Sequence, residues 1–126
     1  MRQAIQAPGG PRAMGAYSPA LRSGNLVFVS GQIPIDPATG QLVDGDMAAQ
    51  ADRVMKNLTA VLAGAGLDFS HVVRTTVFIT DMDQFSAMNE VYARYIVDPP
   101  PARSTVQVAR LPRDVRIEID AIAMLP

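Results

Sequence analysis

The chain has no cysteine and only one histidine, His71. Without thiols it can form neither a disulfide nor a thiolate-based zinc site, and a cysteine nucleophile is excluded. A single histidine also excludes a histidine-rich metal site, so we expect no metal. His71 directly precedes a predicted strand, and a surface or helix-end position is favoured for it over a role as catalytic base.

The sequence also has little excess charge and no long apolar run. Its formal net charge is -1 at pH 7, which provides no broad positive field for a phosphate backbone, so we expect no nucleic acid partner. No uncharged apolar stretch reaches the roughly 18 residues that suggest a membrane span, and the N-terminus has no apolar signal segment. We therefore expect a cytoplasmic protein with no membrane partner.

Hydrophobic residues make up 48% of the 126 residues, enough for one core and a single domain over residues 1–126. The Pro- and Gly-rich stretch 7–24 predicts an irregular arm. Turn residues at 36–41 predict a hairpin between a strand at 25–35 and a short one at 41–45. Apolar spacing predicts helices from about residue 46 to 65 and from Asp81 or Asp83 to the prolines at 99–101. The remaining strands are expected at 71–81, 103–110 and 115–125.

This order of elements predicts a two-layer α+β domain in which two helices cover one face of a sheet. Both faces of several strands carry apolar residues, so the uncovered face would leave a larger apolar patch in water than monomers usually expose. We therefore expect a closed homo-oligomer in which sites can form between subunits.

Polar residues alternate along the last two predicted strands, including Arg103 and Thr105 on one and Glu118 and Asp120 on the other. If residues 111–114 close a hairpin, these polar faces coincide and leave room for a small acid between Arg103 and Glu118. Arginine can bind both oxygens of a carboxylate, and glutamate can deprotonate water. The alternative is that Arg103 is a solvated edge residue or forms a structural ion pair with Glu118 or Asp120, and spacing alone favours this alternative.

The strand at 25–35 is interrupted by Ser30 and Gly31. Glycine weakens the interior of a strand and often marks a bulge or the close approach of a ligand. This pair is therefore a second, weaker indication of a site.

Six segments, in order, resemble the RidA (YjgF) family of enamine/imine deaminases: "GAYSPA", "VSGQIPIDPATG", "RTTVFITDM", "MNEVYARY", "PPARSTVQVARLP" and "IEIDAIA". The resemblance runs from about residue 14 to residue 124. It implies a chorismate-mutase-like α+β fold with a mixed sheet, assembled as a homotrimer with clefts between subunits. Family members hydrolyse reactive enamines and imines such as 2-aminoacrylate to 2-keto acids and ammonia, as metabolite damage control. The implied partner is a small imine or enamine carrying a carboxylate, and no cofactor is implied.

The resemblance also implies roles for individual residues. Arg103 matches the arginine that binds the substrate carboxylate, and Glu118 matches the acid that positions the hydrolytic water. Thr105 stands where many members have cysteine, a position whose contact is largely through the backbone. Further residues match those that line the pocket: Tyr17, Ser30, Gly31 and Asn89. Two small departures from the family pattern are Ala16 and Asp120.

Two other functions remain open. The same cleft would serve a non-catalytic binder or sensor of small 2-keto acids. Both functions need Arg103 for binding, but only the enzyme needs Glu118 for turnover. An RNA-acting role, attributed to some relatives of the family, is disfavoured by the acidic balance of the chain and by its lone histidine.

Overall fold

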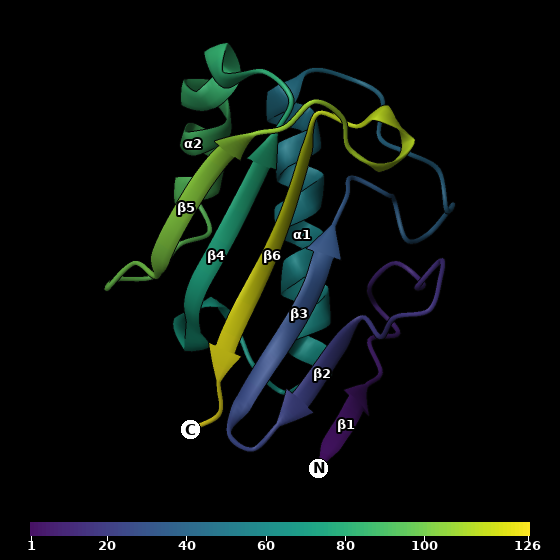
Figure 1. Ribbon diagram of the computed structural model, residues 1–126, viewed down its shortest axis with the longest axis vertical. Coiled ribbons are helices and arrows are strands. Elements are labelled where there is room, and N and C mark those ends of the chain that lie inside the picture. Colours follow the sequence, from purple (N-terminus) through teal and green to yellow (C-terminus); the bar gives the residue numbers. More distant parts are fainter.

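The computed structural model describes residues 1–126 as two layers, a sheet and a pair of helices that lie on one of its faces (Figure 1). Six strands form one sheet in the order β1-β2-β3-β6-β4-β5. The pairing is antiparallel except between β4 and β5, which are parallel. The strands are β1 (Arg2–Ile5), β2 (Ala20–Ser23), β3 (Leu26–Gln32), β4 (Val72–Ile79), β5 (Ala102–Gln107) and β6 (Ile117–Met124). The helices are α1 (Met47–Gly64) and α2 (Phe85–Ala93), with short 3-10 helices η1 (Phe69–His71), η2 (Met82–Gln84) and η3 (Pro112–Asp114). The predicted α+β class, with both helices on one face, is confirmed.

The long helix α1 agrees with the bounds expected from apolar spacing, and local features define its two ends. The Asp46 side chain caps its first turn by accepting a hydrogen bond from the backbone N–H of Ala49 at 2.9 Å. Gly66, just past the last turn, has φ +74, a conformation that costs glycine little. Gly64 has a different role, because a side chain there would overlap the carbonyl oxygen of Gln6.

The core lies between the sheet and α1. In β6, Ile117 and Ile119 have no exposed surface, whereas Glu118 and Asp120 between them are only partly buried. Residues 117, 119, 121 and 123 therefore face α1, and residues 118, 120, 122 and 124 face away from it. Each large aliphatic side chain buried in this way stabilises the fold by roughly 1.5–3 kcal/mol relative to exposure. The fully buried side chains of this layer include Val27, Val54, Leu58, Val61, Leu62, Val77 and Ile79.

The N-terminal part of the sheet differs from the prediction. Strands β1 and β2 were not expected, and β2 lies within the stretch predicted as an arm. Gly24 has φ +62 and closes the tight turn between β2 and β3. Conversely, the predicted hairpin after β3 is reduced to a single bridge between Ile35 and Leu42. The backbone there turns at Asp36, whose side chain accepts a hydrogen bond from the N–H of Ala38, instead of extending.

The last two strands are not neighbours, so the hairpin predicted at 111–114 is wrong. The β4, α2 and β5 segments form a βαβ unit, which sets β5 parallel to β4. Strand β6 pairs with β3 and with the other side of β4. Because alternate residues of β6 are fully buried, this strand occupies the centre of the sheet, and the half-polar β5 lies at its edge.

The face of the sheet that the helices leave open is partly apolar. Phe28 on β3, Val106 on β5 and Met124 on β6 are 40%, 40% and 43% exposed. The apolar second face expected from the sequence is therefore present. Neither helix is long and apolar enough to cross a membrane.

Candidate functional site

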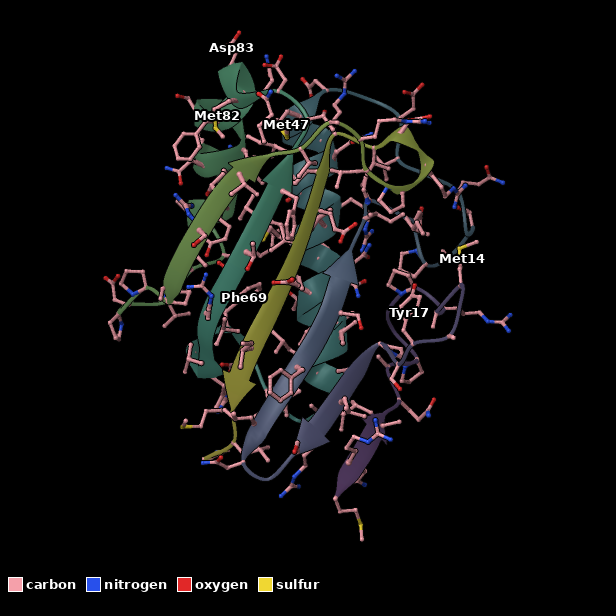
Figure 2. The ribbon with its side chains drawn as sticks, in the orientation of Figure 1. Met14, Tyr17, Met47, Phe69, Met82 and Asp83 are labelled. Carbon is pink, nitrogen blue, oxygen red and sulfur yellow. The ribbon has the colours of Figure 1, made fainter.

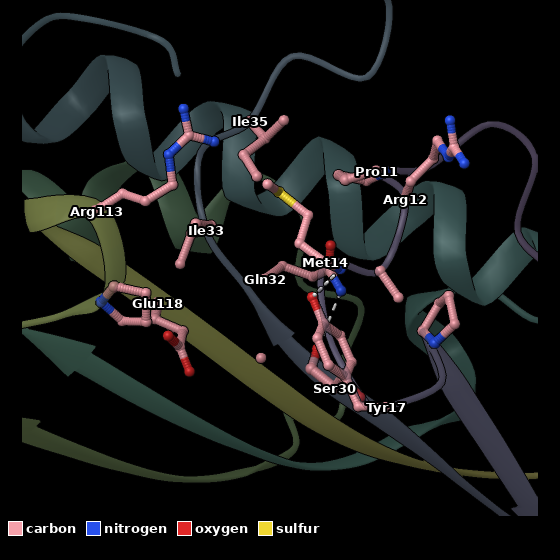
Figure 3. A pocket seen from close by; sticks show the side chains of 14 residues that line it. Pro11, Arg12, Met14, Tyr17, Ser30, Gln32, Ile33, Ile35, Arg113 and Glu118 are labelled. Carbon is pink, nitrogen blue, oxygen red and sulfur yellow. Dashed lines mark hydrogen bonds between the residues drawn. The ribbon is translucent and has the colours of Figure 1, made fainter. Parts of the chain in front are cut away.

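A cavity of ≈ 510 Å³, here called the Glu118 pocket, lies between the arm at 11–19, the end of β3 and the η3 loop (Figure 3). Four of the residues selected from the sequence line it: Tyr17, Ser30, Gly31 and Glu118. The other lining residues are Pro11, Arg12, Ala13, Met14, Pro19, Gln32, Ile33, Ile35, Pro112 and Arg113. Segments far apart in the sequence thus meet around one carboxylate.

Glu118 lies directly against Gly31. The pairing of β3 with β6 is irregular between Val29 and Gln32, which is the bulge indicated by the Ser30-Gly31 pair. A Cβ atom at Gly31 would overlap Oε2 and Cδ of Glu118. The bulge and the missing side chain together provide the space that this carboxylate occupies.

The environment of Glu118 favours the protonated form of its carboxyl group. Burial is the main cause that raises the pKa of Glu118 above its ordinary value, and the negative charge of Asp120 raises it further. No hydrogen bond or ion pair within the protomer engages the Glu118 side chain. A carboxylate of this kind can take up and return a proton closer to neutral pH than an ordinary glutamate.

Two hydroxyl groups in the lining of the pocket form hydrogen bonds with the backbone of the arm. Ser30 Oγ donates a hydrogen bond to the carbonyl oxygen of Ser18 at 2.6 Å. The Tyr17 hydroxyl oxygen accepts one from the backbone N–H of Met14 at 3.3 Å (Figure 3). The Tyr17 hydroxyl can still donate its proton, and Ser30 Oγ can still accept a hydrogen bond.

Arg103 lies elsewhere, in a group of residues here called the Arg103 cluster: Phe85, Asn89, Tyr92 and Arg103. Arg103 Nη1 donates a hydrogen bond to Asn89 Oδ1 at 2.7 Å. The guanidinium carbon is 4.8 Å from the ring centroid of Tyr92 and 5.5 Å from that of Phe85. These contacts fix the side chain and leave most of its donors free, because a guanidinium has five N–H groups.

Arg103 and Glu118 project from opposite faces of the sheet. Arg103 is in register with Thr75, which is fully buried and shares a 2.8 Å hydrogen bond with Tyr92 of α2. Arg103 is therefore on the helix face, whereas Glu118 is on the open face. The prediction that both residues share a face is wrong, because it depended on the hairpin between β5 and β6. The alternative of an ion pair with Glu118 or Asp120 is also wrong, since Arg103 forms no ion pair in the protomer.

Two other predicted residues have clear positions. Thr105, two residues after Arg103 on the same face, buries its Oγ1 without a hydrogen-bond partner. His71 caps η1, where its Nδ1 accepts a hydrogen bond from the backbone N–H of Asp68 at 3.1 Å. The helix-end position favoured for His71 is confirmed.

Sequence reasoning missed the aromatic rings around Arg103 and the two arginines of the Glu118 pocket. Phe85, Asn89 and Tyr92 recur at the spacing of one helix face, but that spacing does not indicate that they surround Arg103. Arg12 and Arg113 lie in loops, where no periodic pattern indicates the direction of a side chain.

In Figure 2, Tyr17 and Met14 are at one edge of the molecule, while Met82 and Asp83, just before α2, are at the opposite edge.

Comparison with known proteins gives consistent matches over nearly the whole chain. A family model described as Endoribonuclease L-PSP matches residues 7–125. Protein DfrA of Myxococcus xanthus is 58% identical over 125 residues, which are 98% of this chain and 95% of the relative. The 2-iminobutanoate/2-iminopropanoate deaminase of Mus musculus is 44% identical over 98% of this chain and 92% of its own length.

Solved structures agree with these sequence matches. RidA from an Antarctic Psychrobacter has a TM-score of 0.93 and 41% identity, over 98% of this chain and 99% of that chain. TdcF of E. coli, crystallised with bound serine, has a TM-score of 0.92 and 40% identity, over 98% and 99% of the two chains.

Proposed function

Because this chain belongs to the Endoribonuclease L-PSP family, which is the RidA (YjgF) family, we propose that it hydrolyses reactive enamines and imines to 2-keto acids and ammonia. The reactive-intermediate deaminase role holds at the level of the family. The main support for this proposal is the Glu118 carboxylate. It lies in a pocket against Gly31, its pKa is raised, and it has no hydrogen-bond or ion-pair partner within the protomer.

The arrangement of the two groups of residues calls for more than one copy of the chain. A substrate held by Arg103 cannot reach Glu118 of the same protomer, because the sheet lies between the two side chains. We infer that the Arg103 cluster of one copy faces the Glu118 pocket of the next in a closed homotrimer. The exposed apolar side chains of the open face support such an assembly, since burial of that face requires another surface.

In this assembly, Arg103 binds the carboxylate of the substrate. Tyr92 and Phe85 hold the guanidinium in place, and Asn89 engages one of its N–H groups. The donors that remain fit both oxygens of a carboxylate. Serine bound to TdcF carries the same carboxylate group beside a nitrogen atom.

Glu118 carries the proton transfers of the hydrolysis. The carboxylate takes a proton from water as the oxygen attacks the carbon of the protonated imine, and the electron pair of the C=N bond moves to nitrogen. The protonated carboxyl then returns the proton to this nitrogen as the C–N bond breaks and ammonia leaves. The hydroxyl left on carbon releases its proton to solvent and becomes the carbonyl of the keto acid. A raised pKa suits a group that both takes and returns a proton.

Hydroxyl groups at the rim of the pocket assist these steps. The free proton of the Tyr17 hydroxyl can hydrogen bond to the leaving nitrogen, and the lone pairs of Ser30 Oγ can accept from the attacking water. The description of the matching family names an endoribonuclease. We do not extend that activity to this chain, because its net charge is -1 and its one histidine is engaged in capping η1.

The experiment that tests the proposal measures ammonia released from freshly generated 2-aminoacrylate. Addition of the wild-type protein should accelerate the release, and Arg103→Ala should abolish the acceleration while the oligomer survives on gel filtration. Unchanged rates in this variant would contradict the proposal. Glu118→Gln distinguishes an enzyme from a sensor, because an enzyme should lose turnover and still bind a 2-keto acid. A protein that binds keto acids but never accelerates deamination is a sensor.

A further inference from the structure

The Glu118 pocket contains two cations that the proposed chemistry does not use, Arg12 and Arg113. Both side chains are exposed, and neither takes part in a hydrogen bond or an ion pair within the protomer. Glu118 is the one acid in the lining, so the two arginines outnumber it. The carboxylate next to the imine is assigned to Arg103 of another copy, so the positive charge of this pocket has no assigned partner.

Arg113 is held at the rim of the pocket by an unusual loop. Arg113 and Asp114 both have φ 57, in the left-handed region that non-glycine residues rarely adopt. Arg110 fixes this turn, because its Nε and Nη2 donate to the two carboxylate oxygens of Asp114 at 2.8 and 3.1 Å. Strained backbone persists where the surroundings hold it, and it is concentrated at binding sites. Here it brings a guanidinium to the same pocket as Glu118 (Figure 3).

The wall between the two arginines is apolar. Figure 3 shows Ile35 and Met14 between Arg113 on one side and Arg12 on the other, with Ile33 between Arg113 and Glu118. A ligand that fits this lining has an aliphatic chain next to its reacting carbon and an anion at the end of that chain. A three-carbon imine would leave both the wall and the cations uncovered.

We propose that the Glu118 pocket binds imines and 2-keto acids whose side chain ends in a second carboxylate, and that Arg113 determines this specificity by binding that carboxylate. The five-carbon 2-iminoglutarate is the model substrate. The inference rests on the proposed function for the reaction itself, and it adds the substrate class. The planar guanidinium of Arg113 matches both oxygens of a carboxylate, as does that of Arg103 at the other end of the ligand.

The test compares the binding of 2-oxoglutarate with that of 2-oxopentanoate, which has the same chain length without the second carboxylate. Calorimetry on the wild-type oligomer should give a preference for 2-oxoglutarate on the order of tenfold, as expected of one charged hydrogen-bonded contact. In Arg113→Gln the ratio of the two dissociation constants should fall to about one, and Arg113→Lys should retain part of the preference. Arg22→Gln removes the same charge from an exposed strand outside the pocket and should keep the wild-type ratio.

Deamination of 2-iminoglutarate and 2-iminopropanoate is measured in parallel, with both imines generated in place by amino-acid oxidases. A wild-type protein that prefers 2-oxoglutarate in binding but accelerates neither deamination supports this inference and contradicts the proposed function. A protein that accelerates both but binds the two keto acids equally overturns the inference and leaves the proposed function intact. The assignment to Arg113 is also overturned if the preference survives in Arg113→Gln, or if it is lost only in Arg12→Gln.

Discussion

Arg103 and Glu118 belong to one sheet but project from its two opposite faces. Arg103 is in register with Thr75 of β4 and stacks on the rings of α2, while Glu118 is in register with Phe78 and faces the open side. No small molecule can contact both side chains of one copy, because the backbone of the sheet separates them. The proposed site therefore depends on two copies of the chain.

Replacement of Gly31 tests whether the position of the Glu118 carboxylate matters. In Gly31→Ala the new methyl group would overlap Oε2 and Cδ, so the flexible carboxylate must move. We expect kcat to fall on the order of 100-fold, as for other displacements of about 1 Å, with little change in Tm. Gly9→Ala is the matched control, because a Cβ there meets only Ala60 at an ordinary 3.8 Å. Equal activities in the two variants would refute this role of Gly31.

The raised pKa of Glu118 predicts a pH-dependent stability. Burial and Asp120 raise this pKa above its ordinary value of 4.5, so the folded protein holds the proton more tightly than the unfolded chain. Stability therefore falls as pH rises from about that value through the raised pKa. Glu118→Gln removes the penalty and should raise Tm at pH 7 by roughly 1 to 3 °C, a small effect because the group is half-exposed.

Thermal unfolding at fixed protein concentration from pH 4 to pH 8 measures this effect. The advantage of Glu118→Gln should disappear at the acid end of the series. The exposed pair of Glu90 with Arg94 provides the control variant Glu90→Gln, for which no such gain is expected. A Glu118→Gln protein that is less stable than wild type at pH 7 would contradict the assigned environment.

Asp120 offers a separate test on the reaction. Its negative charge is the second cause of the raised pKa of Glu118, after burial. In Asp120→Asn the acid limb of the kcat/KM profile should move to lower pH, but not the whole way to an ordinary glutamate, because burial remains. An unmoved acid limb would show that Asp120 does not influence the Glu118 carboxylate.

The contact of Tyr95, which follows the end of α2, with α1 predicts a stability change outside the site. The Tyr95 hydroxyl donates a hydrogen bond to Asp52 of α1, which lowers the pKa of Asp52, while burial is the main cause that raises the pKa of Tyr95 to about 12. Tyr95→Phe should destabilise the protein by about 0.5–1 kcal/mol at pH 7. This loss should diminish below the ordinary Asp52 pKa of 3.8, where the carboxylate is protonated.

Chemical denaturation of Tyr95→Phe, Asp52→Asn and the double variant measures this interaction. The two single changes remove the same hydrogen bond, so their effects on the free energy of unfolding should not add. Strict additivity would show that the contact contributes nothing to stability.

The amino-acid pattern predicts α1, β4, β6 and the placement of both helices on one face, because long apolar periodicities reflect burial in a single core. It does not predict β1 and β2. These strands are four residues each, at the edge of the sheet, with side chains that are mostly exposed. Their pairing is decided by contacts with β3 rather than by their own composition, and the glycines and prolines between them favour the interpretation as an arm.

The site is predictable in its parts but not in its arrangement. Motif likeness selected both Glu118 and Gly31 for the site, and the glycine inside the strand indicated the bulge. The contact between the two residues appears only in the structure. The order of the strands in the sheet decides whether Arg103 lies near Glu118. That order depends on the βαβ crossover through α2, which the alternation of residues along single strands does not predict. The positions of the Arg12 and Arg113 side chains depend on loop conformations, which no periodicity in the sequence predicts.

The most direct test of a site shared between copies is to mix two inactive variants. Arg103→Ala keeps an intact Glu118 pocket, and Glu118→Gln keeps an intact Arg103 cluster. Each alone should leave deamination of 2-aminoacrylate unaccelerated. When the two are unfolded together at equal amounts and refolded, random assembly should give about a quarter of the wild-type number of complete sites. Activity near that fraction, absent when the folded variants are combined without exchange, is the predicted result. Refolded mixed oligomers with no activity would contradict the account.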